Sequence, residues 1–454
     1  MRMLASRMSG VVLCFVLMLS GAAGQKSSKN YSGVDTTGYK LVAVKVSGTA
    51  RYTDKEIVAA TGLQIGQNAA EGDFKEGVRR LGDSGLFSDV TYSYTSLGSN
   101  VKLELQLSDN GKAKLVPAHF ENIVWFTDDE LESALQARVP LFKKLLPLSG
   151  NLADRVSEAL QAMLTEKQLP GRVDYLREGE GDESGEKSGD EVRGIVFRVD
   201  EVSIRIHDVE FPGASPEQTA LLATVARRLA GAEYGRTNLA AAAKFDFLPV
   251  YLQRGYLKAT FARSDAHVLP ASSSGDAQAP GELEVDAILP VTPGKVYATS
   301  GVDWKGASAI GAGELAALLH LPLDQPANAV RLASDLESVT KLYRRRGYMM
   351  VQVKPDARLN EEKSTVHYDL NIVEGDLYKM GELEITGLDT QARSKMVAAW
   401  TLQVGQPYNA EYPKKFLRDT DQLLPRGVGW AVEVHETPDS RDKTVDVEIH
   451  FKQQ

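Results

Sequence analysis

One pattern recurs five times along this 454-residue chain and limits its fold more than any other feature. A helix-like run ends at a glycine, and a strand-like stretch follows it. In most copies a large apolar or aromatic residue comes between the glycine and the strand-like stretch. The period of about 80–90 residues exceeds that of solenoid repeats, and each copy is long enough to hold its own core. The sequence therefore predicts five small domains of one kind. The glycines are Gly85, Gly171, Gly255, Gly347 and Gly427.

The first copy shows the order of its elements most clearly. Thr53 and Glu56 have the spacing of a capping box, which satisfies the free amides that open a helix. Residues 101–107 alternate apolar and polar side chains, as a strand with one buried face does. The order is β-α-α-β-β. The expected elements are strand 41–46, helices 54–61 and 70–81, and strands 90–94 and 101–107.

This order limits the sheet topology. If successive elements alternate in direction, strands one and three run parallel, and strands two and three form an antiparallel hairpin. Strand three then lies in the centre, and the two helices cover one face of the sheet. We expect an α+β fold, a tandem array of five domains, each a three-stranded mixed sheet covered by two helices. Strands one and two form the edges, whose unpaired backbone groups can accept another strand.

The first 24 residues have the features of a signal peptide. Arg2 and Arg7 form a basic start, 11–19 is a short apolar run, and 22–24 offers small residues for cleavage. Retention as a membrane anchor is the alternative. We expect no membrane-spanning segment after it, because no later apolar run is long enough. The expected ranges are 1–24 signal peptide, 25–38 flexible leader, and repeats one to five at 39–110, 111–201, 202–294, 295–375 and 376–454.

Composition narrows the classes of function. The net charge of −9 argues against nucleic acid as a partner, since such proteins usually present a basic face. Cys14 is the only cysteine and lies in the signal peptide, so the mature chain has no disulfide or thiolate metal site. Glu178–Glu191 and Pro270–Gly281 are polar runs expected to be loose hairpin loops.

Patterns that resemble catalytic or metal sites have simpler interpretations. Gly82-Asp83-Ser84-Gly85 imitates the nucleophile stretch of trypsin-like proteases, but it also reads as a helix end, and the other repeats lack the serine there. The seven histidines show no spacing suited to one metal site on a helix. We therefore expect no enzyme activity, no catalytic residues, no cofactor and no metal site.

Several short motifs together resemble the polypeptide-transport-associated (POTRA) domain. They match best in repeats one and five, well in repeat four, less in repeat three, and least in repeat two, which has Pro170-Gly171-Arg172-Val173 where glycine and an aromatic residue are expected. The motifs are the strand ends at Gly48 and Gly387, the turns Gly66-Gln67 and Gly405-Gln406-Pro407-Tyr408, the Gly85–Val90 junction, and Val373-Glu374-Gly375.

The resemblance implies a location and a role. POTRA domains stand in the periplasm before an outer-membrane β-barrel that inserts or secretes proteins, whereas this sequence accounts for the repeats alone. We expect an exported periplasmic scaffold, associated with the outer membrane. Its expected partners are protein clients or an outer-membrane β-barrel complex, with possible contact to the membrane surface. The alternative is a structural adaptor that bridges a separate barrel, a division complex or the cell wall without handling clients.

The expected mechanism is β-augmentation, in which an extended client segment adds to the exposed second strand of a repeat. Arg344-Arg345-Arg346 has two interpretations: a solvated helix end, or a contact for an acidic partner or lipid headgroup. The candidate edges are 89–94, 256–261, 348–353 and 430–434, and the candidate edge residues are Val90, Tyr92, Tyr256, Lys258, Tyr348, Met350, Trp430 and Val432.

Overall fold

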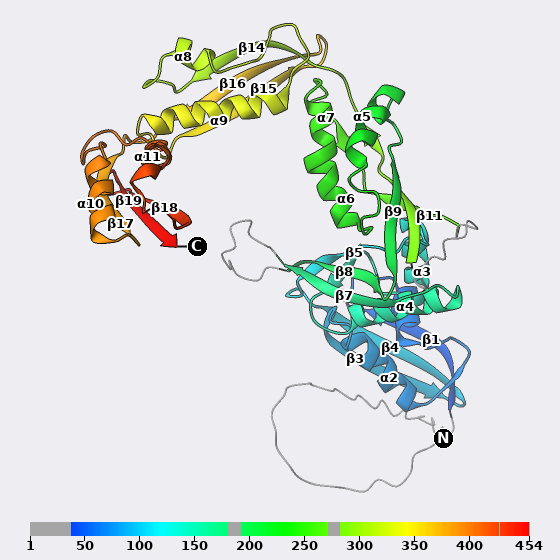
Figure 1. The fold of residues 1–454 in the computed structure, drawn as a ribbon. Coiled ribbons are helices and arrows are strands. Elements are labelled where there is room, and N and C mark those ends of the chain that lie inside the picture. The colour runs from blue at the N-terminus through cyan, green and yellow to red at the C-terminus, as the bar shows by residue number, and fades with distance from the viewer. Residues whose placement is uncertain (1–37, 180–191, 271–281, 426, 454) are drawn as a thin grey trace, which may run out of the picture. The chain divides into compact units, whose positions relative to one another are not determined.

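The computed structural model describes residues 38–179, 192–270, 282–425 and 427–453 (Figure 1). The expected signal peptide, almost all of the leader and most of both polar loops lie outside these residues. The described chain forms two compact bodies. The first body contains the described residues of Met1–Glu210, Ala226–Ala240 and Arg263–Leu289. The second body contains the described residues of Phe211–Val225, Ala241–Ala262 and Pro290–Gln454. Repeat three contributes to both bodies.

The elements follow the expected order in each range. Repeats one and two contain β1 (Tyr39–Ser47), α1 (Asp54–Thr61), β2 (Asn68–Ala69), α2 (Glu71–Gly82), β3 (Phe87–Leu97), β4 (Asn100–Asp109), β5 (Leu115–Phe120), α3 (Asp128–Arg138), β6 (Leu145–Pro147), α4 (Leu152–Glu166), β7 (Arg172–Gly179) and β8 (Val192–Asp200).

Repeat three contains more pieces than the others, including one turn of π-helix. Its elements are β9 (Ser203–Glu210), α5 (Pro216–Ala226), α6 (Arg236–Ala242), η1 (Ala243–Phe247), α7 (Leu248–Leu252), β10 (Thr260–Phe261), β11 (Asp265–Val268), β12 (Glu282–Ile288) and β13 (Val291–Thr292).

Repeats four and five return to the simpler order. They contain β14 (Ala298–Lys305), α8 (Ala312–Ala316), α9 (Ala329–Arg345), β15 (Gln352–Asn360), β16 (Thr365–Val373), β17 (Lys379–Thr386), α10 (Thr390–Ala399), α11 (Tyr412–Thr420), η2 (Asp421–Leu423), β18 (Trp430–Asp439) and β19 (Thr444–Gln453).

The sheets have the predicted topology. In each repeat the last long strand is central, pairs in parallel with the first strand and pairs antiparallel with the second. The α+β fold class is confirmed, with added short edge strands. The sheet orders are β2-β1-β4-β3, β6-β5-β8-β7, β11-β12-β9, β14-β16-β15 and β17-β19-β18, and β10-β13 forms a separate pair.

Local sequence signals account for the helix starts. The Thr53 hydroxyl accepts from the Glu56 amide and the Glu56 carboxylate accepts from the Thr53 amide, which completes the predicted capping box. Thr127 and Glu130 repeat this arrangement at α3. Alternation in β4 buries Val101, Leu103, Leu105 and Leu107 completely or nearly so; each large side chain buried in this way contributes about 1.5–3 kcal/mol.

A glycine directly follows the first strand in repeats one, four and five for a steric reason. Gly48 has φ +90°, and a Cβ there would lie 1.9 Å from the carbonyl oxygen of Leu107. At Gly387, with φ +81°, the same distance to the Phe451 carbonyl would be 1.8 Å. A side chain would therefore force the first strand away from the central strand. Repeat two instead uses the side chain of Asn122, which bonds the amide and carbonyl of Val199.

Helices in the described part of the chain are too short or too polar to cross a membrane.

Candidate functional site

The second strand lies at a margin of its sheet in every repeat. In the sheet orders β3, β7, β11, β15 and β18 each have a partner on one side only, among the residues that the structure describes (Figure 1). Their outer backbone groups are the features that an added strand would use. These five margins form the candidate site.

Half of the predicted edge residues lie in these strands. Val90 and Tyr92 belong to β3, and Trp430 and Val432 belong to β18. Tyr92 is buried, and the other three are half-buried, so these side chains face the helices rather than solvent. What they offer to a partner is therefore their backbone.

The other four predicted edge residues are not in strands, which corrects the expected edges 256–261 and 348–353. Tyr256 and Lys258 precede β10, and Tyr348 and Met350 precede β15. The chain forms a turn here, in which the Val351 amide donates to the Tyr348 carbonyl. The alternation in 256–261 and the apolar run in 348–353 both imitate a strand, but contacts with the next repeat determine the conformation.

The junction between repeats four and five explains that turn. The Tyr378 amide donates to the carbonyl of Gly347 over 2.8 Å. Gly347 has φ +93°, and a Cβ there would lie 2.7 Å from the Tyr378 carbonyl oxygen. Met349 is buried in the same hydrophobic cluster as Tyr378 and Phe451 of repeat five. The residues after the glycine therefore connect one repeat to the next.

Repeats three and four meet in the same way. The Tyr297 amide donates to the Gly255 carbonyl over 2.8 Å, and Leu257 packs against the buried cluster of repeat four. Lys258, predicted as an edge residue, forms an ion pair with Glu361 in the β15–β16 turn. The Tyr297 hydroxyl also donates to Glu361, over 2.8 Å.

The junction between repeats one and two uses close backbone packing. A Cβ at Gly85 would lie 1.9 Å from the Ser149 carbonyl oxygen, and the Asn151 amide donates to the Asp83 carbonyl over 2.7 Å. The Tyr52 hydroxyl donates to the Leu141 carbonyl over 3.0 Å, and burial raises its pKa to about 12. Each repeat therefore receives backbone contacts from its neighbour.

Repeats two and three are joined by a buried arginine that sequence reasoning missed. The Arg236 side chain is 8% exposed and donates to the Asp128 carboxylate over 2.6 Å. Arg263 reaches the other oxygen of Asp128 at 3.0 Å. The Arg236 amide also donates to the Glu121 carbonyl, at 3.2 Å. These partners are too far apart in sequence for their pairing to be anticipated.

The arginine run at the end of α9 is partly paired within the chain. Arg345 lies 3.7 Å from Glu411, and Arg346 lies 2.5 Å from Glu314. Arg344 is exposed, and its carbonyl accepts from the Ala410 amide. Two of the three guanidinium groups thus have acidic neighbours inside the protein, which supports the interpretation of a charged helix end. Contact with an acidic partner stays a prediction.

Ser84, in the protease-like stretch, has a structural role. It is completely buried, and its hydroxyl donates to the Leu81 carbonyl and accepts from the Leu86 amide. The hydroxyl therefore completes the end of α2.

A cluster on the sheet of repeat four has the composition of a metal site. Oxygen or nitrogen atoms of Asp303, His367 and Asp369 all lie within 4.8 Å of one another. Two cations already neutralise Asp369, because Lys305 is 2.7 Å and Arg358 2.6 Å from its carboxylate. This arrangement favours a charge network over a metal site, since a metal would displace both cations.

The edges differ in how well they are protected against added strands. Charged side chains and proline discourage pairing, and β15 contains Lys354, Pro355 and Arg358, whereas β18 contains Glu433 and Pro438. By contrast, β3 spans 11 residues without proline and carries one charge, Asp89. The margin of β3 is therefore the most permissive of these three.

Proline also reveals which amides face outward. A proline has no amide hydrogen, so within a paired strand it occupies positions whose nitrogen faces away from the partner. Pro355 pairs with Leu370 and Ala357 with Tyr368, without an intervening bulge, so the Ala357 amide faces the open margin. In β3, Leu97 and Asn100 flank a two-residue turn and bond to each other, so the amide of Ser96 faces outward.

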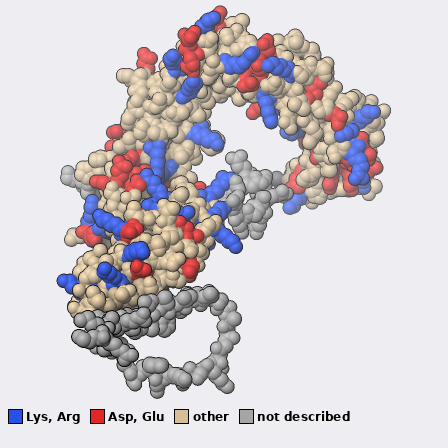
Figure 2. Space-filling view, turned by 180° about the vertical axis from the view of Figure 1, so that it is seen from behind, with Lys and Arg blue, Asp and Glu red and all other residues tan. Residues whose placement is uncertain are grey.

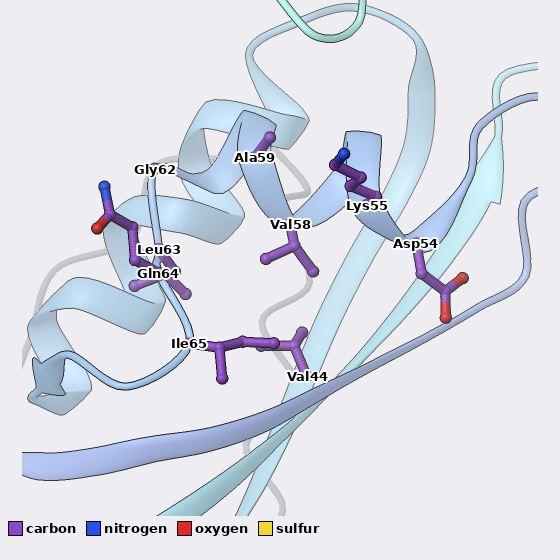
Figure 3. Close-up of a pocket in the computed structure, with 9 residues that line it drawn as sticks. All are labelled: Val44, Asp54, Lys55, Val58, Ala59, Gly62, Leu63, Gln64 and Ile65. Carbon is purple, nitrogen blue, oxygen red and sulfur yellow. The ribbon is translucent and has the colours of Figure 1, made fainter.

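An apolar groove lies beside the other margin of repeat one (Figure 3). It has a volume of about 530 Å³ and lies between β1, α1 and the loop that follows α1. Val44, Val58 and Ile65 contribute its apolar floor and wall. Its other lining residues are Asp54, Lys55, Ala59, Gly62, Leu63 and Gln64.

Charges of both signs are interspersed on the face seen in Figure 2. Basic and acidic groups alternate there over short distances rather than forming one large field. This distribution agrees with a protein partner better than with nucleic acid, which requires a continuous basic surface.

Comparison with known proteins assigns a class to this arrangement. Residues 284–375 match the family model POTRA, described as a surface antigen variable number repeat. The sheet of that segment, with its central third strand, recurs in the other four ranges. One stretch of the chain therefore matches the POTRA domain by sequence, and the same sheet topology recurs in the other repeats.

Several solved structures are similar to parts of the chain. POTRA3-5 of BamA from Haemophilus influenzae is 18% identical, with 55% of this chain and 96% of that chain covered and a TM-score of 0.39. The N-terminal domain of Omp85 from Thermosynechococcus elongatus is 17% identical, with 56% and 99% covered and a TM-score of 0.23. CdiB from Escherichia coli is 15% identical, with 52% and 35% covered and a TM-score of 0.21.

Proposed function

We propose that this protein is a non-catalytic periplasmic scaffold that binds extended segments of client or partner proteins by β-augmentation. The resemblance to POTRA domains suggests that it acts in outer-membrane protein assembly or secretion. The open margin of β3 carries the proposal, because it combines length, few charges and outward amides. Backbone hydrogen bonds supply an affinity that tolerates many sequences, as unfolded clients require.

The margins are not equivalent in this proposal. β3 offers an uncharged stretch from Val90 to Leu97, whereas a client strand on β15 would meet Lys354, Asp356 and Arg358. We infer that β3 binds clients of varied sequence and that β15 adds selectivity for segments of complementary charge. β18, with Glu433 and Glu436, would favour basic segments.

Proline substitution at outward amides tests the mechanism. Ser96→Pro in β3 removes an outward donor at an exposed position without loss of a hydrogen bond to β4. Ser96→Ala keeps the amide and serves as the control. The probe is a peptide that copies one membrane-spanning strand of an outer-membrane barrel protein, with affinity measured by fluorescence anisotropy. We expect Ser96→Pro to weaken binding several-fold and Ser96→Ala to leave it unchanged.

The same pair of substitutions can be made in β15. Ala357 is exposed, so Ala357→Pro removes its outward amide, and Ala357→Ser is the control. If both proline variants fold and bind the peptide as the wild type does, β-augmentation at β3 and β15 is wrong. The structural adaptor would then be the better interpretation. Affinity purification from envelope extracts separates the two, since a barrel-assembly partner favours the scaffold and a divisome or wall partner the adaptor.

A further inference from the structure

The groove of repeat one has an apolar interior that solvent reaches. Figure 3 shows the side chains of Val44, Val58 and Ile65 directed into one space between β1 and α1. Ile65 is 63% exposed, so most of its apolar surface stays in contact with water and contributes no burial free energy to folding. Complete burial of such a side chain is worth about 1.5–3 kcal/mol, which a ligand could recover. Asp54 and Lys55 also line the groove and give it no net charge.

The exposed side chain occupies a position that recurs within the chain. Ile65 precedes Gly66-Gln67 in repeat one, and Val404 precedes Gly405-Gln406 in repeat five. Val404 is 74% exposed. Both glycines have positive φ, 97° and 86°, so the same turn presents both side chains to solvent. In repeat one, this turn also forms a wall of the groove.

The groove borders a strand margin that is distinct from β3. β1 pairs with β2 only at Tyr39 and Lys40. From Val44 to Ser47, its partner among the described residues is β4 alone. Val44 belongs both to this open stretch and to the lining of the groove. Unpaired backbone and an apolar side-chain pocket therefore lie together.

We propose that this groove binds an extended segment of a partner protein that carries a large aliphatic side chain. The segment adds to the open stretch of β1, and its aliphatic side chain enters the space between Val44, Val58 and Ile65. Backbone bonds supply the affinity, and the pocket selects aliphatic over polar residues. The absence of a net charge at the groove favours an uncharged segment. This site does not rest on the proposed function, because it uses the opposite margin of the sheet.

Two substitutions at matched positions test the site. Ile65→Asp places a charge in the groove at a solvent-exposed position, so the fold should persist, which circular dichroism can check. Val404→Asp makes the same change at the same turn position in repeat five. The probe is a twelve-residue peptide that alternates leucine with threonine, and a second peptide has serine in place of leucine. We expect the leucine peptide to bind the wild type and Val404→Asp at least tenfold more tightly than it binds Ile65→Asp. The serine peptide should bind the wild type more weakly than the leucine peptide does.

Location is tested separately from affinity. In a Cys14→Ser background, Ile65→Cys is the only cysteine and can carry a photoreactive group. Illumination should attach the leucine peptide at this position, and Ser96→Pro should not reduce the yield. No binding to the wild type, equal affinity for both aspartate variants, or no attachment would each overturn the proposal. So would self-association through Ile65 in place of peptide binding, since the occupant would then be a second copy.

Discussion

The backbone amide of Tyr378 bonds to the carbonyl of Gly347 over 2.8 Å, and Tyr297 bonds to Gly255 over the same distance. The first strand of one repeat thus begins against the glycine that ends the helices of the repeat before it. This relationship makes the recurring glycine a connection between repeats, rather than only a helix end.

Gly347→Ala should therefore cost more stability than the same change at a glycine whose Cβ position is open. Gly427→Ala is the matched control, because φ is +86° there and a Cβ would meet nothing within 4 Å. Backbone strain alone costs about 1–2 kcal/mol in both variants. At Gly347, the contact with Tyr378 should add about 1–3 kcal/mol. Urea denaturation measures both, and equal losses would contradict the role of the junction.

Glu374 should make repeat four sensitive to acid. Burial alone would raise the pKa of this carboxyl, but hydrogen bonds from Ser308, Ala309 and Tyr343 outweigh it and lower the pKa to about 2. Because the folded pKa lies below the ordinary value of 4.5, the stabilisation is present above pH 4.5 and is lost as the pH falls toward 2.

Hydrogen–deuterium exchange of β16 measures that loss locally. Between pH 4.5 and pH 2, the wild type should lose more protection than Glu374→Gln, which carries no titrating group at this position. Glu362→Gln, at an exposed position in the β15–β16 turn, is the control and should behave as the wild type does. Identical pH dependence in Glu374→Gln and the wild type would refute the assignment.

The two arginines that contact Asp128 should differ in how much they contribute to the stability of the fold. Arg236 is 8% exposed and Arg263 48% exposed at the side chain. Arg236→Met keeps the apolar stem but removes buried charge-assisted hydrogen bonds, with an expected cost of about 1.5–3 kcal/mol. Arg263→Met should cost less than about 1 kcal/mol, as exposed ion pairs do. Thermal denaturation of both variants gives the comparison, and a reversed order would exclude Arg236 as the main contact.

The cluster of Asp303, His367 and Asp369 should not bind zinc at micromolar concentrations. Lys305 and Arg358 already neutralise Asp369, and zinc would have to displace both. Isothermal titration with zinc should give no more heat for the wild type than for His367→Ala. Binding that His367→Ala abolishes would show that the cluster is a metal site.

Local patterns were enough to predict the repeated sheet. The alternation of Val101, Leu103 and Leu105 predicts a strand with one buried face, and the structure buries all three. The capping box at Thr53 fixes where α1 begins. These features depend on residues close in sequence, so the sequence alone carries them.

The junctions could not be predicted because they depend on distant residues. Residues 348–353 are apolar except for Gln352, as in a buried strand, yet β15 begins only at Gln352, because Met349 is buried in the cluster of repeat five. Arg236 forms an ion pair with Asp128, which lies more than a hundred positions earlier in the sequence. The sequence did contain one signal of the junctions. A tyrosine lies three positions after a glycine both at Gly294–Tyr297 and at Gly375–Tyr378.

The burial of Met349 in repeat five has a mechanical consequence. The margin strand β15 starts only a few residues later, so one short stretch of backbone serves both the joint and the edge. Tension applied to the start of β15 would pass along the backbone to Met349, and from there to repeat five through the packing of its side chain. A partner bound to this strand would therefore load the junction between repeats four and five directly.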